Sequence, residues 1–355
     1  MNTLITISAF ILTLGILITV HEWGHFIVAR KLGVKVLRFS LGFGKQIWRY
    51  YDKKGTEYCV SMIPLGGYVK MLDEREGEVL PEELAYAFNR KSVWTRIAVV
   101  LAGPVANFLF AIIAFTLVYS IGIRDFTHAN AIIGSVEANS PAAIAGLQSA
   151  DHITAVDNEP IKTWPELVKK VSAHPAEKLQ LAVKRNDHTL QIAITPGTKM
   201  HEGKAFGFIG VTMDQQQLTL IREPLHTALL HGIHDTWFYS LLTFDAIFKM
   251  LVGQLGLENI SGPITIAVYA GSTVQIGIVY FLQFLAFLSI SLGVINLLPI
   301  PMLDGGHLLY YVIEAIRRKP LSRKIQEMGL SIGIVILFSL MVLAFYNDVI
   351  QLGSR

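Results

Sequence analysis

The sequence contains few charged residues and a single cysteine. Asp, Glu, Lys and Arg make up 16% of its 355 residues, whereas soluble domains have about a quarter. Hydrophobic residues account for 52% of the chain, so the composition favours a membrane protein over a soluble one. The one cysteine, Cys59, excludes a framework of internal disulfides.

The features of a cleaved signal peptide are also missing. No Lys or Arg precedes the first apolar run, and no small-residue cleavage site follows it. We therefore expect this run to remain as the first of four spans in a lipid bilayer, each near the ~20 apolar residues that a bilayer requires. The predicted spans cover residues 4–28, 97–123, 276–298 and 330–345.

The basic residues between these spans predict an orientation. Lys and Arg are concentrated between the first and second spans and between the third and fourth. The positive-inside rule places both basic links in the cytoplasm, and both termini and the long segment after the second span outside. The basic links could instead bind nucleic acid, but their location between spans makes topology the simpler explanation, so we expect no nucleic-acid partner.

The pentapeptide HEWGH ends the first apolar run, at residues 21–25. On a helix, His21 and His25 share one face and can bind one metal ion, while Glu22 is placed to take a proton from water. A catalytic zinc site usually has a third protein ligand. Val28 and Lys31 stand where a metzincin has glycine and histidine, so the third ligand must come from a distant segment.

Asp304 is the candidate for this third ligand. Pro299 and Pro301 break the helix at the end of the third span, and Asp304 follows them. A carboxylate at the membrane margin suggests function or pairing. The predicted orientation gives it the same depth as His21 and His25, so we expect one metal site from the three residues. Taken alone, Asp304 could be a helix-terminating carboxylate at a Gly-Gly turn.

The segments between the spans predict two further modules. Residues 34–72 predict β-structure with a turn at residues 52–55. Residues 130–213 have the order of an α+β module and resemble a PDZ domain of the bacterial type, above all in NSPAAIAGLQSADHITAVDNEPI. Residues 207–210 resemble the loop that receives a peptide carboxylate in that family. PDZ domains bind extended peptides at a sheet edge, which predicts a peptide ligand.

Residues 218–260 are amphipathic and too polar to span a membrane readily. One hypothesis is a second metal site, formed from His226, His231, His234 and Asp245. We favour the alternative that these residues form the polar face of a helix on the membrane surface.

Five motifs resemble the site-2 protease family, the M50-type intramembrane zinc metalloproteases. They are HEWGH (21–25), PLGGYVKM (64–71), AGPVANF (102–108), SGPI (261–264) and NLLPIPMLDGGH (296–307). The resemblance covers almost the whole chain. It implies Zn²⁺ as the cofactor and assigns roles to six residues: metal ligands His21, His25 and Asp304, catalytic acid and base Glu22, and substrate contacts Asn296 and Pro299. For Asn296 an interhelical hydrogen bond is nearly as plausible, and we expect one for Asn107.

The same resemblance implies a place and a substrate class. Family members cut single-span membrane proteins, including anti-sigma factors of the sigma-E stress response and remnant signal peptides. We therefore expect a protein of the bacterial inner membrane with a periplasmic PDZ domain. Residues 34–71 are similar to the membrane-associated β-loop of the family, and our hypothesis is that an edge strand there pairs with the unwound substrate.

The predicted fold is a polytopic α-helical membrane protein with four transmembrane helices, a membrane-associated β-loop and one extracytoplasmic α+β PDZ domain, where well-known relatives carry two in tandem. The predicted segments are 1–33 (first span with HExxH), 34–96 (β-loop and linker), 97–123 (second span), 130–213 (PDZ), 218–275 (surface helix), 276–306 (third span with LDG), 307–329 (cytoplasmic link) and 330–346 (fourth span). Two other functions stay open from the residues alone, a transporter and a catalytically silent PDZ scaffold.

Overall fold

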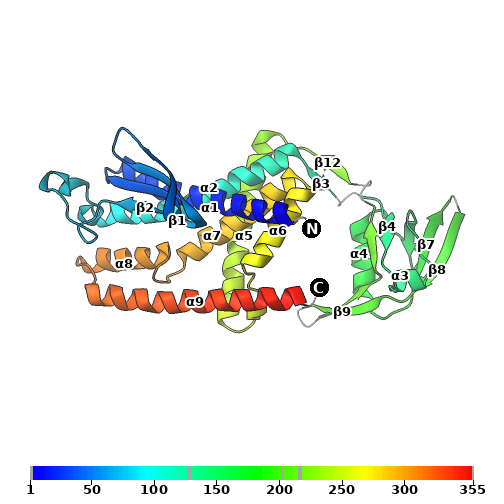
Figure 1. Ribbon diagram of the computed structural model, residues 1–355. Coiled ribbons are helices and arrows are strands. Elements are labelled where there is room, and N and C mark those ends of the chain that lie inside the picture. Colours follow the sequence, from blue (N-terminus) through cyan, green and yellow to red (C-terminus); the bar gives the residue numbers. More distant parts are fainter. Residues whose placement is uncertain (1–2, 126–128, 187, 202–203, 215–217, 354–355) are drawn as a thin grey trace. The chain divides into compact units, whose positions relative to one another are not determined.

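We describe the protein in a computed structural model that covers residues 3–125, 129–186, 188–201, 204–214 and 218–353 (Figure 1). The chain forms two compact units. Met1–Ile121 and Glu223–Arg355 make the first, which we call the helical unit, and Gly122–Arg222 make the second, which we call the PDZ-like unit. In the sequence, the PDZ-like unit is therefore an insertion within the helical unit.

Four helices of the helical unit, counted over the described residues, are long and apolar enough to cross a membrane. They are α1 (Thr3–Lys31), α2 (Val93–Ile121), α7 (Ile278–Leu297) and α9 (Arg323–Gly353). Such apolar runs form helices because a helix pairs its backbone groups internally where water is absent. They overlap the four predicted spans and fit a membrane protein, although α9 extends beyond the predicted residues 330–345 at both ends.

Helix α7 lies within the third predicted span, residues 276–298, but the predicted segment 276–306 is not one continuous helix. Helix α6 (Pro263–Ile276) ends at Gly277, which has a φ of 144°, and α7 starts directly after it. After α7 the chain turns through residues 298–303, and α8 (Asp304–Arg317) begins. Residues 307–329, predicted as a link, therefore contain most of an amphipathic helix. The two prolines explain the break, because neither can continue α7.

Helix α2 lies at the centre of the helical unit. It packs against α1, α7, α8 and α5 (Leu225–Leu251). Ala111, Ala114 and Phe115 of α2 are buried against Ala286 and Ile290 of α7. Small residues let the helix backbones approach closely, which is a common basis of packing between membrane helices.

The two helices that precede α7 also pack through small residues. A Cβ on Gly232 of α5 would lie 2.7 Å from the Thr116 Oγ1 of α2, and a Cβ on Gly271 of α6 would lie 2.7 Å from the Thr6 Oγ1 of α1. Helix α5 is not among the four helices that could cross a membrane. Figure 1 shows α5 running across the direction of α1 and α9 rather than alongside them.

The end of α9 caps the start of α6, which gives the SGPI motif a structural role. Asp348 is 1% exposed and accepts hydrogen bonds from the backbone amides of Gly262 (3.0 Å) and Ile264 (2.8 Å). Pro263 has no amide that needs a partner. A Cβ on Gly262 would lie 2.4 Å from the Asp348 Oδ2, so only glycine lets the carboxylate approach. The free amides of a helix start are thus paired with a negative charge.

Strands β1 (Val36–Tyr51) and β2 (Glu57–Met71) form a folded-back hairpin. Residues 36–41 pair with residues 57–60 on one side and with residues 67–71 on the other, while residues 46–51 pair with residues 57–61. Residues 67–71 therefore lie at an edge of this small sheet, and we call them the edge strand. The sheet packs on α1 through Phe39, whose ring centroid lies 5.5 Å from that of Phe26.

The PDZ-like unit has its own apolar core. A four-stranded sheet in the order β6-β5-β7-β8 is accompanied by the pairs β4-β11, β9-β10 and β3-β12. The strands are β3 (Ile123–Asp125), β4 (Ile133–Val136), β5 (His152–Val156), β6 (Glu159–Pro160), β7 (Leu179–Arg185), β8 (His188–Ile194), β9 (Gly197–His201), β10 (Lys204–Phe208), β11 (Val211–Met213) and β12 (Thr219–Ile221).

Two helices complete this unit, α3 (Pro141–Ile144) and α4 (Trp164–Ala173). Helix α4 begins at a capping box, in which Glu166 reaches back to the amide of Thr163. Its Leu167 and Val171 are buried, as its amphipathic pattern predicts. Elsewhere in the chain, short 3-10 helices span Pro81–Tyr86, Phe88–Arg90 and Leu257–Asn259.

Candidate metal centre

The structure brings His21, His25 and Asp304 together from the two ends of the chain. The two histidines lie one turn apart on α1, and Asp304 begins α8. The Asp304 Oδ2 lies 3.1 Å from the His21 Nε2 and 3.3 Å from the His25 Nε2, and the two Nε2 atoms are 3.3 Å apart. Within the described residues this is the one group of three such side chains whose ligand atoms all lie within 4.8 Å of one another.

The three residues fit a divalent metal. Two imidazole nitrogens and one carboxylate oxygen form a ligand set that catalytic zinc uses, with a fourth position left for water or substrate. The Asp304 Oδ2 is buried and has no hydrogen bond of good geometry, although both imidazoles are close to it. A buried carboxylate oxygen without a hydrogen bond is costly unless a cation compensates its charge. The unpaired Asp304 oxygen and the set of donor atoms therefore both indicate a cation site among these three residues.

Two glycines place Asp304 at the site. Residues 298–303 fold back at the end of α7, so the first turn of α8 packs against the last carbonyls of α7. A Cβ on Gly305 would lie 2.2 Å from the Leu298 carbonyl oxygen, and one on Gly306 would lie 2.5 Å from that of Ile300. The LDGG sequence is therefore needed for the tight turn that aims the carboxylate, in addition to supplying it.

Helix α2 contacts both imidazoles at their Nδ1 atoms, on the side away from Asp304. The Nδ1 of His25 lies 2.8 Å from the Val99 carbonyl oxygen, and the Nδ1 of His21 lies 3.1 Å from the Nδ2 of Asn107. Each imidazole thus presents its Nε2 to Asp304 while its other nitrogen contacts α2. Metal-binding histidines commonly have such a partner, which fixes the ring and the tautomer. The sequence predicted Asn107 only as an interhelical link and assigned nothing to Val99.

Gly103 of α2 is in contact with the rings of both histidines. A Cβ there would lie 2.3 Å from the His25 Nε2 and 2.8 Å from the His21 Cε1. These distances are far below van der Waals contact, so any larger residue would displace the ligands. This glycine lies in the AGPVANF motif, but the motif alone predicted no role for it. The signal was present in its spacing from Asn107, since both lie on the same face of α2.

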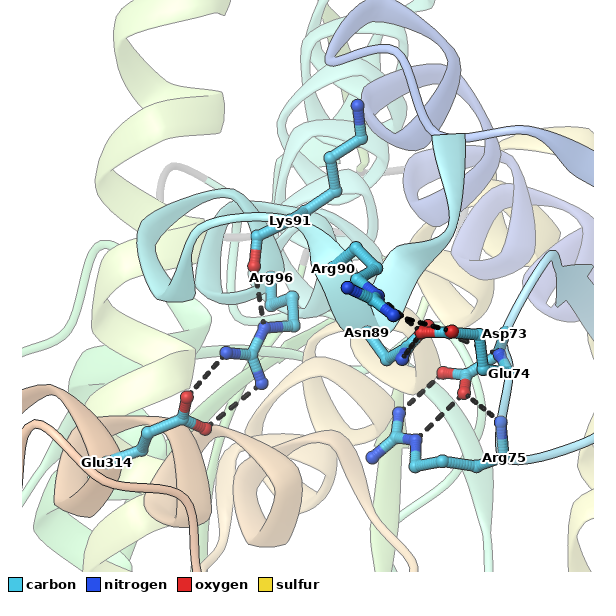
Figure 2. A network of polar contacts seen from close by, with 8 residues as sticks. All are labelled: Asp73, Glu74, Arg75, Asn89, Arg90, Lys91, Arg96 and Glu314. Atoms are coloured by element: carbon cyan, nitrogen blue, oxygen red, sulfur yellow. Dashed lines mark hydrogen bonds and ion pairs between the residues drawn. The ribbon is translucent and has the colours of Figure 1, made fainter. Parts of the chain in front are cut away.

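Ion pairs tie α8 and the segment after β2 to the start of α2 and the residues before it. Figure 2 shows the Arg96 guanidinium facing the Glu314 carboxylate of α8, with N–O distances of 3.0 and 2.6 Å. Arg75 makes a similar double contact with Asp73. Next to them, hydrogen bonds from Arg90 and Asn89 lower the pKa of Glu74 to about 2 (Figure 2). The Arg96–Glu314 pair therefore holds α8, the helix that begins with Asp304, against α2.

The ligands line a cavity of about 800 Å³. Glu22, next to His21 on α1, also lines it, and so does Asn296 from the last turn of α7. Asn296 is 9% exposed. Pro299, the other predicted substrate contact, lies in the turn after α7, is exposed and is not among the residues that line this cavity.

The edge strand forms one wall of the same cavity, which all five of its residues line. A Cβ on Gly67 would lie 3.1 Å from the Cγ of Glu22, and the backbone amide of Val69 faces the Glu22 carboxylate. The other side of this strand pairs with residues 36–41, so the Val69 amide reaches Glu22 from the unpaired side.

The structure does not assemble the second metal site that the α5 histidines suggested. His231 contacts Glu223 at 3.4 Å, while His234 contacts Asp235 at 3.1 Å. These are separate pairs, and their ligand atoms do not converge on a common point within the described residues. Asp245 instead pairs with Lys249 one turn later on α5.

The PDZ-like unit has a groove of about 600 Å³ between α4 and β11. Apolar residues of α4, among them Leu167 and Val168, line one side, and residues 207–210 line one end. These four residues are the predicted carboxylate loop. An extended peptide added beside β11 would lie in this groove.

The chain resembles known proteins over most of its length. Residues 9–340 match Peptidase family M50. The chain is 36% identical to the Regulator of sigma E protease of Salmonella typhi, covering 98% of this chain and 99% of that protein. It is 37% identical to the Regulator of sigma-E protease RseP of Escherichia coli K12, covering 96% and 98%, and 36% identical to a Putative zinc metalloprotease of Vibrio cholerae, covering 97% and 98%.

The alignment with the Salmonella protein is 445 positions long, longer than the 355 residues of this chain, so that relative contains residues this chain lacks. Among solved structures, the PDZ domain of an SdrC-like protein from Listeria monocytogenes matches 26% of this chain and 95% of its own at 22% identity, with a TM-score of 0.22.

Proposed function

The chain belongs to peptidase family M50, and from this premise we propose that His21, His25 and Asp304 bind the zinc ion of an intramembrane protease. The family resemblance predicted from the motifs is thereby confirmed, and the protein is a zinc metalloprotease of the site-2 type. The observation that carries the assignment of ligands is their convergence from α1 and α8. Neither a transporter nor a silent scaffold accounts for that convergence together with the family match.

The residues around the site suggest how the reaction proceeds. When bound, zinc supplies Lewis acidity for the scissile carbonyl and lowers the pKa of a water molecule. Glu22 removes the proton of the attacking water and later returns it to the leaving amine. The Asn296 side-chain amide, at the cavity wall, donates a hydrogen bond to the developing oxyanion.

The edge strand presents the substrate. A helical substrate must unwind before its peptide bond can be attacked, and its freed backbone groups then need partners. The free side of the edge strand faces Glu22 and offers such groups along the cavity. An unwound substrate segment added there would extend the sheet and pass the metal ligands.

We further propose the biological setting. The substrates are single-span membrane proteins, such as an anti-sigma factor and remnant signal peptides, in the bacterial inner membrane. Support comes from the resemblance to the site-2 protease family and from relatives whose names are Regulator of sigma E protease and Regulator of sigma-E protease RseP. Both termini and the PDZ-like unit are periplasmic by the distribution of Lys and Arg. The groove between α4 and β11 binds a peptide of the substrate or of a regulator.

The decisive experiment uses the purified full chain and a test substrate with one membrane span. Cleavage should be lost on chelation and in Glu22→Gln, while Glu22→Gln still binds zinc. Cleavage that persists without metal would contradict the proposal. For the edge strand, Met71→Pro removes one backbone amide and Met71→Ala is the matched control. Loss of cleavage in the proline variant alone, with zinc retained, supports strand pairing, and equal cleavage by both variants refutes it.

A further inference from the structure

Asn107 is the buried polar residue of α2 that faces the metal centre. It is 0% exposed, and its amide nitrogen lies 3.1 Å from the Nδ1 of His21. Its amide oxygen, Oδ1, is also buried and has no hydrogen-bond partner. A buried amide with one unpaired oxygen costs free energy, so its presence in the middle of a packed helix needs an explanation.

The chemistry of His21 provides one. In the arrangement seen, Asn107 donates through Nδ2 to a bare Nδ1, so the ring proton of a neutral His21 is on Nε2, which faces Asp304 at 3.1 Å. A metal bound through Nε2 reverses these roles. The proton of the neutral ring must then be on Nδ1, which becomes a donor and requires an acceptor.

A half-turn of the Asn107 amide supplies this acceptor. It exchanges Nδ2 and Oδ1, which have nearly the same size and shape. Because Oδ1 has no partner in the arrangement seen, the turn breaks no hydrogen bond of that oxygen. His25 differs, since its Nδ1 faces the Val99 carbonyl oxygen at 2.8 Å, which can only accept. The tautomer of His25 is fixed in advance, whereas that of His21 depends on Asn107.

We propose that Asn107 is a positioning residue of the metal centre, which matches its amide to the tautomer of His21. Its Oδ1 accepts from the Nδ1–H of His21 when Nε2 binds the metal, and its Nδ2 donates to Nδ1 when the ring proton is on Nε2 instead. The inference rests on the proposed metal site. The backbone of Asn107 is held separately, since its carbonyl oxygen accepts a hydrogen bond from Ser289 of α7 at 2.9 Å.

The test measures zinc affinity of the full-length purified protein by competition with a chromogenic chelator. Asn107→Leu removes both polar atoms and should weaken zinc binding about 10- to 100-fold, the usual effect of losing such a partner. Asn107→Asp keeps an acceptor and should bind zinc at least as tightly as the natural protein. Ser289→Ala, which affects only the backbone contact of Asn107, should leave the affinity unchanged.

The outcomes separate this inference from the proposed function. The inference about Asn107 is overturned if Asn107→Leu binds zinc as tightly as the natural protein. It is also overturned if Asn107→Asp loses as much zinc affinity as Asn107→Leu. If Asn107→Leu does not fold, Asn107→Asp decides alone, since a tenfold loss in that variant contradicts the inference. His21→Ala tests the site itself, and full zinc binding in that variant would overturn the proposed metal site instead.

Discussion

Replacing Gly103 by alanine should disable the metal centre while adding only one methyl group. The new Cβ would lie 2.3 Å from the His25 Nε2 and 2.6 Å from its Cε1. Atoms of this kind need about 3.5 Å, so either the imidazole or the whole of α1 must move by about 1 Å. Zinc tolerates deviations of only about 0.2 Å in its bond lengths. A misplacement of about 1 Å can cost roughly 100-fold in activity.

The assay combines zinc content with cleavage of a single-span substrate. We expect Gly103→Ala to lose most of its zinc and at least ~100-fold of its activity, while it still folds. Gly15→Ala is the matched control, because Gly15 lies on α1 and a Cβ there meets nothing within 4 Å. Natural zinc content and activity in Gly103→Ala would refute the geometric reasoning, and so would equal losses in the two variants.

Three other predictions concern contacts that hold the site in place. Arg96→Met leaves Glu314, which is 17% exposed, without its partner, and should lower the free energy of unfolding by about 3 kcal/mol. The double change Arg96→Met with Glu314→Leu should recover most of this in thermal unfolding, and no recovery would contradict a role for the pair. Asp348→Ala removes the cap of α6 and should cost about 1–3 kcal/mol. The exposed Ser339→Ala on the same helix should have no effect, and equal melting temperatures of both variants would refute the cap. Glu74 has a pKa of about 2, below its ordinary value of 4.5, so its contribution is complete above pH 4.5 and is lost as the pH falls towards 2. The difference in melting temperature between Glu74→Gln and the natural protein should therefore be constant above pH 5 and shrink below pH 4.5, and a constant difference at all pH values would contradict the assignment.

Much of this architecture could be predicted because its signals are local. Apolar runs specify α1, α2 and α7 through hydrophobicity alone. The spacing of His21 and His25 places both on one helix face. Pro299 and Pro301 predicted the break after α7, and the orientation of the spans gave Asp304 the depth of the histidines. The three ligands could therefore be predicted, although most of the chain separates His25 from Asp304.

The remaining features depend on contacts between distant segments, which no local pattern reports. Gly103 and Val99 act through their distance to the imidazoles, and Gly262 through its distance to Asp348 on another helix. The edge position of residues 67–71 also follows from pairing, because residues 36–41 pair on both sides. Pro299 was predicted from the family resemblance alone, and its substrate contact stays a prediction.

X-ray absorption at the zinc edge tests the central claim most directly. The account predicts a spectrum with two imidazole nitrogens and one carboxylate oxygen at about 2.0–2.2 Å from the metal in the purified protein. Asp304→Ala should lose the carboxylate and most of the bound zinc. A sulfur ligand in the natural protein, or an unchanged spectrum and full zinc content in Asp304→Ala, would contradict it.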